Sequence, residues 1–374
     1  MSLRILFISG TYPPAKCGVG DYTYNLVNTL SSLNDTEIHV ITSSYLGISV
    51  NNCNPFIYPV IDNWRSARII FNKLKEIIKS VKPDIIHFQY LTKEYEKYIS
   101  ISILPVFIKS KFPKLKVVET FHEPVFHSYW KAKIRYLPAL AATDGLIFVD
   151  EEYYNNMPAI YKLLTRKKHR QVIYVASNIP HVCLKNEEID NLRGKLNITK
   201  KELLFAYFGA ITKYRGLESF IEILKRVESK LLIISSLKEE NIYHAQLLSI
   251  FKKEGISERI IITGFLPSIE VAKKLCIADA CIFPQLGGIS PKNTSVLAAL
   301  NQGVFTIATS KTASGYSPKT NLYHVAPGDT EEMIRALKEY AGKRIIPDFQ
   351  LLPDWKHIAR DHNKFYKNIL GEKD

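Results

Sequence analysis

The chain has 374 residues, of which 46% are hydrophobic and 23% are charged, so its composition is that of a globular protein and not of a disordered or fibrous one. Lys and Arg together number 50 against 36 Asp and Glu, which gives a formal net charge of +14. No apolar stretch reaches the roughly 18 residues of a transmembrane helix, and the N-terminal residues lack the cleavage site of a signal peptide. The five cysteines are odd in number and have no zinc-binding spacing, so we expect a soluble, cytoplasmic protein without disulfides.

The first half of the chain alternates apolar strands with amphipathic helices. A helix is expected at 21–33, and a second one at 65–81 ends before Lys82-Pro83. The strands are uniformly apolar, which is typical of a parallel sheet covered by helices on both faces. The expected strands are residues 4–9, 37–42, 84–88, 116–120, 145–149 and 171–175.

A second series of strands and helices follows the polar stretch 185–201 and ends with an amphipathic helix at 354–370. The pattern predicts an α/β fold with two doubly wound, Rossmann-like domains, residues 1–180 and 181–354. In open parallel sheets, ligands bind at the carboxyl ends of the strands, so we expect the site in the loops there. The strands of the second series are 202–208, 230–234, 259–263, 280–283 and 304–308.

The excess positive charge is concentrated in the first domain. Residues 97–170 contain 13 basic and six acidic side chains. Such a stretch attracts anions, including phospholipid, nucleic acid and phosphorylated substrates, or it is simply a solvated basic face. A lipid-linked acceptor at an anionic membrane would explain the charge, with 99–108 and 134–140 either as apolar surface or as ordinary core. The chain has no recognised nucleic-acid-binding motif, so we expect no nucleic-acid partner.

Two strand ends in the first domain carry candidate binding groups. After the first strand, Gly18-Val-Gly20 leads into a helix, where backbone N–H groups and the helix dipole favour a phosphate. This loop matches neither a dinucleotide fingerprint nor a P-loop, and such glycines also serve packing alone. His122 follows the strand at 116–120, where it either contacts a sugar and stabilises developing charge or bonds within its own loop.

Two loops of the second domain favour anions. Lys213 and Arg215 precede a helix and are either a diphosphate clamp or two exposed cations in a polar turn. The clamp is chemically reasonable because Arg offers bidentate contacts and Lys a point charge. The Gly-containing loop 284–295 opens another helix, and its backbone amides form a second cradle for anions and hydroxyls.

From one end almost to the other, the chain resembles the retaining GT-B glycosyltransferases, in particular glycosyltransferase family four. The resemblance rests on a series of motifs that occur in the order of the family. They are Tyr12-Pro-Pro with Gly18-Val-Gly-Asp-Tyr22, Lys82-Pro-Asp-Ile-Ile-His87, Thr120-Phe-His122-Glu, Gly209 to Gly216, Gly264-Phe-Leu266, Ala278-Asp-Ala280 to Pro284, and the helix from Trp355 to Tyr366.

The resemblance implies that residues 181–354 hold a nucleotide-sugar donor, linked to UDP or GDP. Residues 1–180, with 355–374 packed back onto them, would hold a glycan or lipid-linked acceptor, with peripheral contact to the inner face of a membrane. A hexose-type sugar would be transferred with retention of configuration. Neither a metal nor another cofactor is implied, because fixed cations and helix ends stabilise the leaving diphosphate, and the sequence has no Asp-x-Asp motif.

The resemblance also implies roles for individual residues. Gly18 and Gly20 would approach the donor diphosphate, and His122 the transferred sugar. Arg215 stands where the family has Lys and would pair with phosphate, helped by Lys213. The contacts to the donor sugar and nucleotide would fall on Phe265, Leu266, Gly288, Ile289, Ser290 and Ser295.

The sequence departs from the family at two Glu residues that lie eight positions apart, here Gly287 and Ser295. A Ser could hold the ribose hydroxyls more weakly than a Glu, whereas Gly287 has no side chain with which to touch the sugar. The Arg that commonly follows Gly209 is Ala210. An alternative function is therefore a non-catalytic GT-B-like subunit that partners an active transferase.

Overall fold

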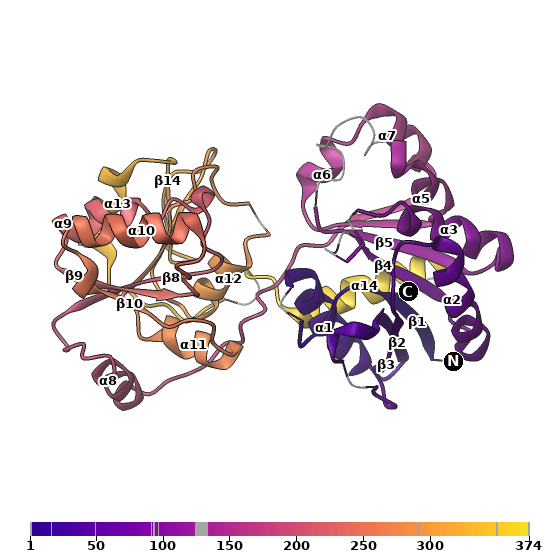
Figure 1. Ribbon diagram of the computed structural model, residues 1–374, viewed down its shortest axis with the longest axis horizontal. Coiled ribbons are helices and arrows are strands. Elements are labelled where there is room, and N and C mark those ends of the chain that lie inside the picture. Colours follow the sequence, from indigo (N-terminus) through magenta and orange to yellow (C-terminus); the bar gives the residue numbers. More distant parts are fainter. Residues whose placement is uncertain are drawn as a thin grey trace. The chain divides into compact units, whose positions relative to one another are not determined.

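The computed structural model describes residues 2–15, 17–48, 50–90, 92, 94–95, 97–123, 134–290, 292–348 and 351–372 (Figure 1). The chain forms two compact units. Unit 1 comprises Met1–Val175 together with Asp354–Asp374, and unit 2 comprises Ala176–Pro353. The division therefore falls a few residues before the expected boundary at 180, and the C-terminal helix belongs to unit 1.

Unit 1 is built on sheet A, a seven-stranded sheet in which every neighbouring pair is parallel. Every residue of β4 is buried, as expected for a strand with helices on both faces. The edge strand β3 was not predicted, because Pro59 interrupts its apolar run. In spatial order the strands are β3 (Phe56–Ile61), β2 (Thr36–Ser43), β1 (Leu3–Ile8), β4 (Ile85–Tyr90), β5 (Lys116–Phe121), β6 (Gly145–Phe148) and β7 (His169–Val172).

From β1 the strand order of sheet A runs one way to β2 and β3 and the other way to β4 through β7. Because the connections are right-handed in both directions, the helices of unit 1 cover both faces of the sheet. The first helix begins at Gly18, three residues before the sequence pattern predicts it. The last helix is capped by the Asp354 side chain, which accepts from the His357 N–H at 2.7 Å. The helices are α1 (Gly18–Ser31), α2 (Ala67–Val81), α3 (Ser100–Lys111), α5 (Leu137–Ala142), α6 (Glu151–Asn155), α7 (Ala159–Thr165) and α14 (Trp355–Leu370), with a 3₁₀ turn η1 (Ser44–Leu46).

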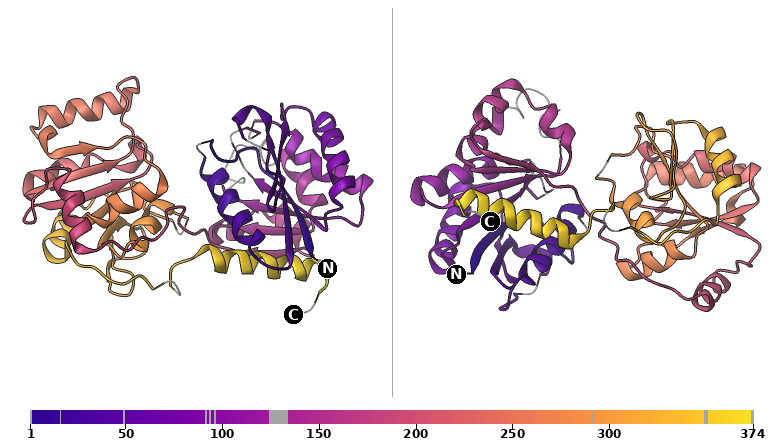
Figure 2. Two further views of the ribbon diagram at one scale, coloured as in Figure 1. Left: turned by 90° about the horizontal axis from the view of Figure 1, so that it is seen from below. Right: turned by 180° about the vertical axis from the view of Figure 1, so that it is seen from behind.

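The prediction that the C-terminal helix returns to the first domain is confirmed. Helix α14 packs against α1 and buries one apolar stripe in unit 1. Figure 2 shows α14, in yellow, running along unit 1 in both views. The two ends of the sequence therefore contribute to one core.

Unit 2 repeats the doubly wound plan on sheet B, with one antiparallel edge strand, β13. In spatial order the strands are β10 (Ile260–Ile262), β9 (Ser229–Ile234), β8 (Leu203–Phe208), β11 (Ala280–Phe283), β12 (Thr306–Thr309), β14 (Leu322–Val325) and β13 (Gly315–Ser317). The helices are α8 (Asn186–Gly194), α9 (Ser219–Arg226), α10 (Ile242–Lys253), α11 (Ser268–Cys276), α12 (Thr294–Asn301) and α13 (Thr330–Tyr340), with 3₁₀ turns η2 (Lys213–Arg215) and η3 (Ser257–Arg259).

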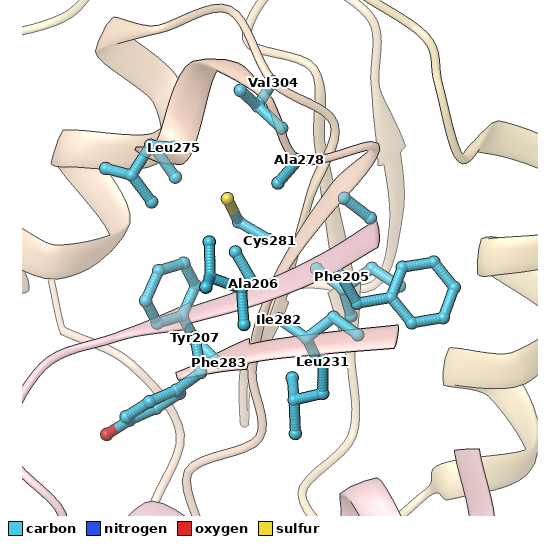
Figure 3. Packing of buried hydrophobic residues seen from close by; sticks show 14 of the residues in the cluster. Phe205, Ala206, Tyr207, Leu231, Leu275, Ala278, Cys281, Ile282, Phe283 and Val304 are labelled. Carbon is cyan, nitrogen blue, oxygen red and sulfur yellow. The ribbon is translucent and has the colours of Figure 1, made fainter. Parts of the chain in front are cut away.

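The core of unit 2 lies between sheet B and its helices. Figure 3 shows Cys281 of β11 packed with Leu275 of α11, Ala278 and Val304, next to Ala206 of the neighbouring strand β8. All five are buried, which explains why these strands read as continuous apolar runs. Within the described ranges, no helix combines the length and the apolar character that crossing a bilayer requires.

Candidate functional site

His122 lies at the carboxyl edge of sheet A, directly after β5. Its backbone N–H donates to the carbonyl of Tyr90 at 2.8 Å, and its Nε2 lies 2.7 Å from the Gln89 side-chain oxygen. With its proton on Nε2, the imidazole donates to that oxygen. The Tyr22 ring packs edge-on against the imidazole at 4.5 Å between centroids. His122 is thus held in one orientation at the edge where a ligand is expected.

A buried group of His and Tyr side chains from α1, β4 and α14 packs next to His122. Tyr22 Oη lies 3.3 Å from Nε2 of His362 on α14, and Tyr366 Oη lies 2.6 Å from Nδ1 of His87 on β4. Burial lowers the pKa of His362 to about 4. Burial also lowers the pKa of His87 well below its usual value, and the nearby His362 and His122 add to this. The two buried histidines are therefore neutral, and α14 holds the ring that packs on His122.

The two glycines at the start of α1 differ in their surroundings. A Cβ added at Gly18 would meet nothing within 4 Å, so this position is open to a ligand. A Cβ at Gly20 would lie 3.0 Å from Thr11 Oγ1 and 3.3 Å from the Tyr12 nitrogen. Gly20 is buried, and its lack of a side chain lets α1 pack closely against the preceding loop. The surface of α1 at Gly20 is therefore covered by that loop. The side-chain position is therefore open at Gly18 and filled by protein at Gly20.

At the carboxyl edge of sheet B, the loop after β8 packs tightly on the loop after β11. Gly216 has a φ of +67°, and a Cβ there would collide with the carbonyl oxygen of Pro284. The Leu286 N–H donates to the carbonyl of Tyr214 at 3.1 Å. A Cβ at Gly287 would lie 2.8 Å from the Tyr214 ring, so this ring occupies the space where the Glu side chain of the family would begin.

The two cations of the loop after β8 remain available to a ligand. Lys213 is exposed and Arg215 is half-buried, and neither side chain forms a hydrogen bond or an ion pair with any residue that the structure describes. The Arg215 charge acts on Tyr207, but burial dominates there and raises the pKa of that phenol to about 12. The turn η2 thus carries two positive charges without a neutralising carboxylate among the described residues.

The amides assigned to the donor sugar are only partly available. The Gly288 N–H donates to the Gln285 carbonyl at 3.2 Å, and the Ile289 N–H donates to the Thr309 carbonyl at 2.7 Å. These bonds hold the loop against the end of β12, so the expected role of these two amides is corrected to a structural one. The Ser290 amide has no acceptor among the described residues and is the one that remains for a ligand.

The remaining predicted donor-site residues also lie at this edge. Ser295 is in the first turn of α12, and its Oγ would lie 2.9 Å from a Cβ at Gly209, where β8 ends. Phe265 follows β10 with 66% of its surface exposed, and the adjacent Leu266 packs partly against the core. The donor-site residues predicted in unit 2 are therefore grouped at the carboxyl ends of β8, β10 and β11.

His244 on α10 was not singled out from the sequence, yet it holds the loop after β8 in place. Its Nδ1 accepts from the Lys238 N–H at 3.1 Å, so Nε2 carries the proton and donates to the Ile211 carbonyl at 3.0 Å. Gln89, which orients His122, was also missed. Neither residue belongs to a recognisable motif, because each acts on a residue 33 positions away in the sequence.

Comparison with known proteins agrees with this geometry. Residues 202–342 match the family described as glycosyl transferases of group 1. The chain is similar to a glycosyltransferase from Rickettsia africae ESF-5 (16% identity, TM-score 0.75, all of both chains covered) and to sucrose-phosphate synthase from Thermosynechococcus elongatus (14%, TM-score 0.73, 99% of both). It is also similar to HepE from Anabaena in complex with UDP-glucose (13%, TM-score 0.66, 99% of this chain and 98% of HepE).

The architecture is therefore that of the GT-B glycosyltransferases, as the sequence resemblance predicts, and the match to the group 1 glycosyl transferase family lies within unit 2. A search of curated protein sequences found no match.

Proposed function

We propose that this protein is a retaining glycosyltransferase that moves a hexose-type sugar from a UDP- or GDP-linked donor to a glycan or lipid-linked acceptor. The observation that carries the proposal is the loop after β8, where Lys213 and Arg215 have no ionic partner among the described residues. The loop lies within the matched glycosyltransferase domain. HepE, which has the same fold, was solved with UDP-glucose.

In the proposed reaction, unit 2 stabilises the leaving nucleoside diphosphate. Breaking the bond between sugar and phosphate places negative charge on the diphosphate, and donors that are already oriented there lower the barrier most. Arg215 would form bidentate contacts with the phosphate oxygens, and Lys213 would add a point charge. The Gly18 amide at the start of α1, with its helix-end dipole, is a further group that suits a phosphate. With these groups the diphosphate can leave without a metal ion.

We propose that His122 acts on the transferred sugar. Its imidazole is oriented by Gln89 and Tyr22, so little rearrangement is needed for it to contact a sugar hydroxyl. His122→Ala should lower kcat by about 100-fold, while KM for the donor changes less, because the contact strengthens as the sugar becomes electron-poor. Steady-state kinetics with a verified donor and a thermal melt of the variant measure this. An unchanged kcat in a folded variant would remove His122 from the reaction.

The first experiment is a thermal-shift screen of nucleotide sugars. A donor present at 100 times its Kd should add about 2.7 kcal/mol to the free energy of unfolding, which raises Tm by several degrees. UDP-glucose and GDP-mannose are the first two ligands to try, with free glucose as the control that should produce no shift. If no UDP-, GDP- or ADP-linked sugar raises Tm, the protein is not a nucleotide-sugar enzyme.

A non-catalytic GT-B-like subunit is a second candidate, and one observation favours it. Gly287 cannot be exchanged for Glu without displacing Tyr214, and Ser295 stands at the second Glu position. A donor that raises Tm but is neither transferred nor hydrolysed over a range of acceptors would support this candidate. Turnover by the isolated chain would exclude it.

A further inference from the structure

A second basic site lies at the opposite edge of sheet A from His122. A pocket of about 570 Å³ opens at the amino ends of β5, β6 and β7, entirely within unit 1. α5 and the chain just after α7 form part of its wall. The lining residues include four lysines, one histidine and one carboxylate, namely Lys109, Lys116, Lys167, Lys168, His169 and Asp144.

The positive charge of this pocket is only partly compensated. Asp144 pairs with Lys109 at 2.6 Å and lies 4.0 Å from Lys116. The Lys168 ammonium donates to the carbonyls of Ala141, at 2.9 Å, and Thr143, which do not neutralise its charge. Burial lowers the pKa of Lys168, and an anion beside its ammonium would stabilise the charged form and raise this pKa. One carboxylate against four ammonium groups leaves a site suited to phosphate.

Helix α7, beside this pocket, turns an aliphatic face to solvent. Ile160, Leu163 and Leu164 are 53%, 56% and 38% exposed, and their spacing of i, i+3 and i+4 places them on one side of the helix. The pocket residue Lys167 follows at i+7 and is exposed. Tyr161, on the other side, is buried. An exposed aliphatic stripe that ends in lysines has the character of a helix lying in a membrane interface.

The sequence left 99–108 and 134–140 open, either as apolar surface or as ordinary core. For most of those residues the structure decides for core, because Ile101, Leu104, Ile108, Ala139 and Leu140 are buried in the core of unit 1. The apolar surface next to the lysines is instead the outward side of α7.

We propose that the basic pocket binds the phosphate of an anionic phospholipid while the aliphatic face of α7 inserts among the lipid head groups. A phospholipid surface is the occupant that matches both features, since it supplies fixed negative charge to the lysines and an apolar layer to Ile160, Leu163 and Leu164. The site is separate from the carboxyl edge and does not depend on the glycosyl transfer proposed above.

Vesicle sedimentation with the full chain tests the proposal. We expect pelleting with phosphatidylcholine vesicles that contain about 30% phosphatidylglycerol, and little with phosphatidylcholine alone, because each lysine near an anionic surface strengthens binding. The double variant Lys116→Glu/Lys167→Glu should weaken binding tenfold or more. Leu163→Asn, at an exposed position where folding is not at risk, should weaken it several-fold. The control Lys252→Glu/Lys253→Glu makes the same charge change at exposed positions of α10 in unit 2.

Three outcomes would overturn the proposal. The first is equal loss of binding in the control variant, which would indicate attraction by net charge alone. The second is equal pelleting with both kinds of vesicle. The third is tight binding of glycerol 3-phosphate without any binding to anionic vesicles, which would assign the pocket to a soluble phosphate ester. Donor binding and transfer play no part in these measurements, so their failure and the failure of the enzymatic proposal are distinguishable.

Discussion

Arg215→Ala should lower kcat/KM for the donor by about 100-fold or more, which corresponds to roughly 2.7 kcal/mol of transition-state stabilisation. The guanidinium is half-buried, carries no counter-ion among the described residues and is placed by a turn that packs on the Pro284 carbonyl. Its charge is therefore free to act on the departing diphosphate, where negative charge increases as the reaction proceeds. Steady-state kinetics of the wild type and the variant, with the same donor and acceptor, measure the effect.

The matched control is Arg226→Ala, since Arg226 is an exposed arginine of the same unit whose guanidinium Nη2 pairs with Glu331 at 2.9 Å. That variant should keep its activity. Arg215→Lys should recover part of the loss, because a single ammonium supplies the charge but not the bidentate geometry. An Arg215→Ala enzyme with full activity would show that the diphosphate is neutralised elsewhere.

Glu119→Gln should raise the free energy of unfolding at pH 8 by about 3 kcal/mol. Glu119 lies on β5 and is 1% exposed, and burial raises its pKa to about 7 from an ordinary value of 4.5. The Tyr136 hydroxyl, which donates to its Oε2, and the charge of Lys168 oppose this rise without cancelling it. Gln keeps the acceptor for Tyr136 and cannot ionise.

The sign of this effect follows from proton binding. Between about pH 4.5 and 7 the unfolded chain loses the Glu119 proton while the folded chain keeps it, so stability falls as pH rises through this window. At pH 5 the variant should gain less than about 1 kcal/mol and at pH 8 the full amount. Urea unfolding at both pH values measures it, with Glu76→Gln, on the exposed surface of α2, as the control. An equal gain at pH 5 and pH 8 would contradict a raised pKa.

Much of the fold could be predicted from the sequence because it depends on local patterns. Uniform apolar runs such as those at β4 and β8 predict buried parallel strands, and the apolar stripe from Trp355 to Tyr366 predicts a helix that packs on a core. The edge strand β3 was missed because Pro59 breaks its pattern. The family resemblance added the pairing of the last helix with the first domain, which no local pattern contains.

The candidate site could be predicted only in part. The residue types at Lys213 and Arg215 fitted either a diphosphate clamp or two exposed cations in a polar turn. The amides of Gly288 and Ile289 looked equally suitable, yet both donate to carbonyls of the protein. Whether a backbone amide already donates to a carbonyl of the protein depends on which carbonyl lies beside it in the folded chain. The sequence does not contain this information.

The sequence by itself thus determined the α/β class, the carboxyl-edge position of the candidate residues and the cations of the loop after β8. Local periodicity and residue chemistry suffice for these. Only the tertiary structure decided that Gln89 orients His122, that Gly20 packs closely on the preceding loop, and that α7 carries the exposed aliphatic face. The physical reason is that hydrogen-bond partners and burial are set by contacts between segments distant in the chain, which no window of sequence contains.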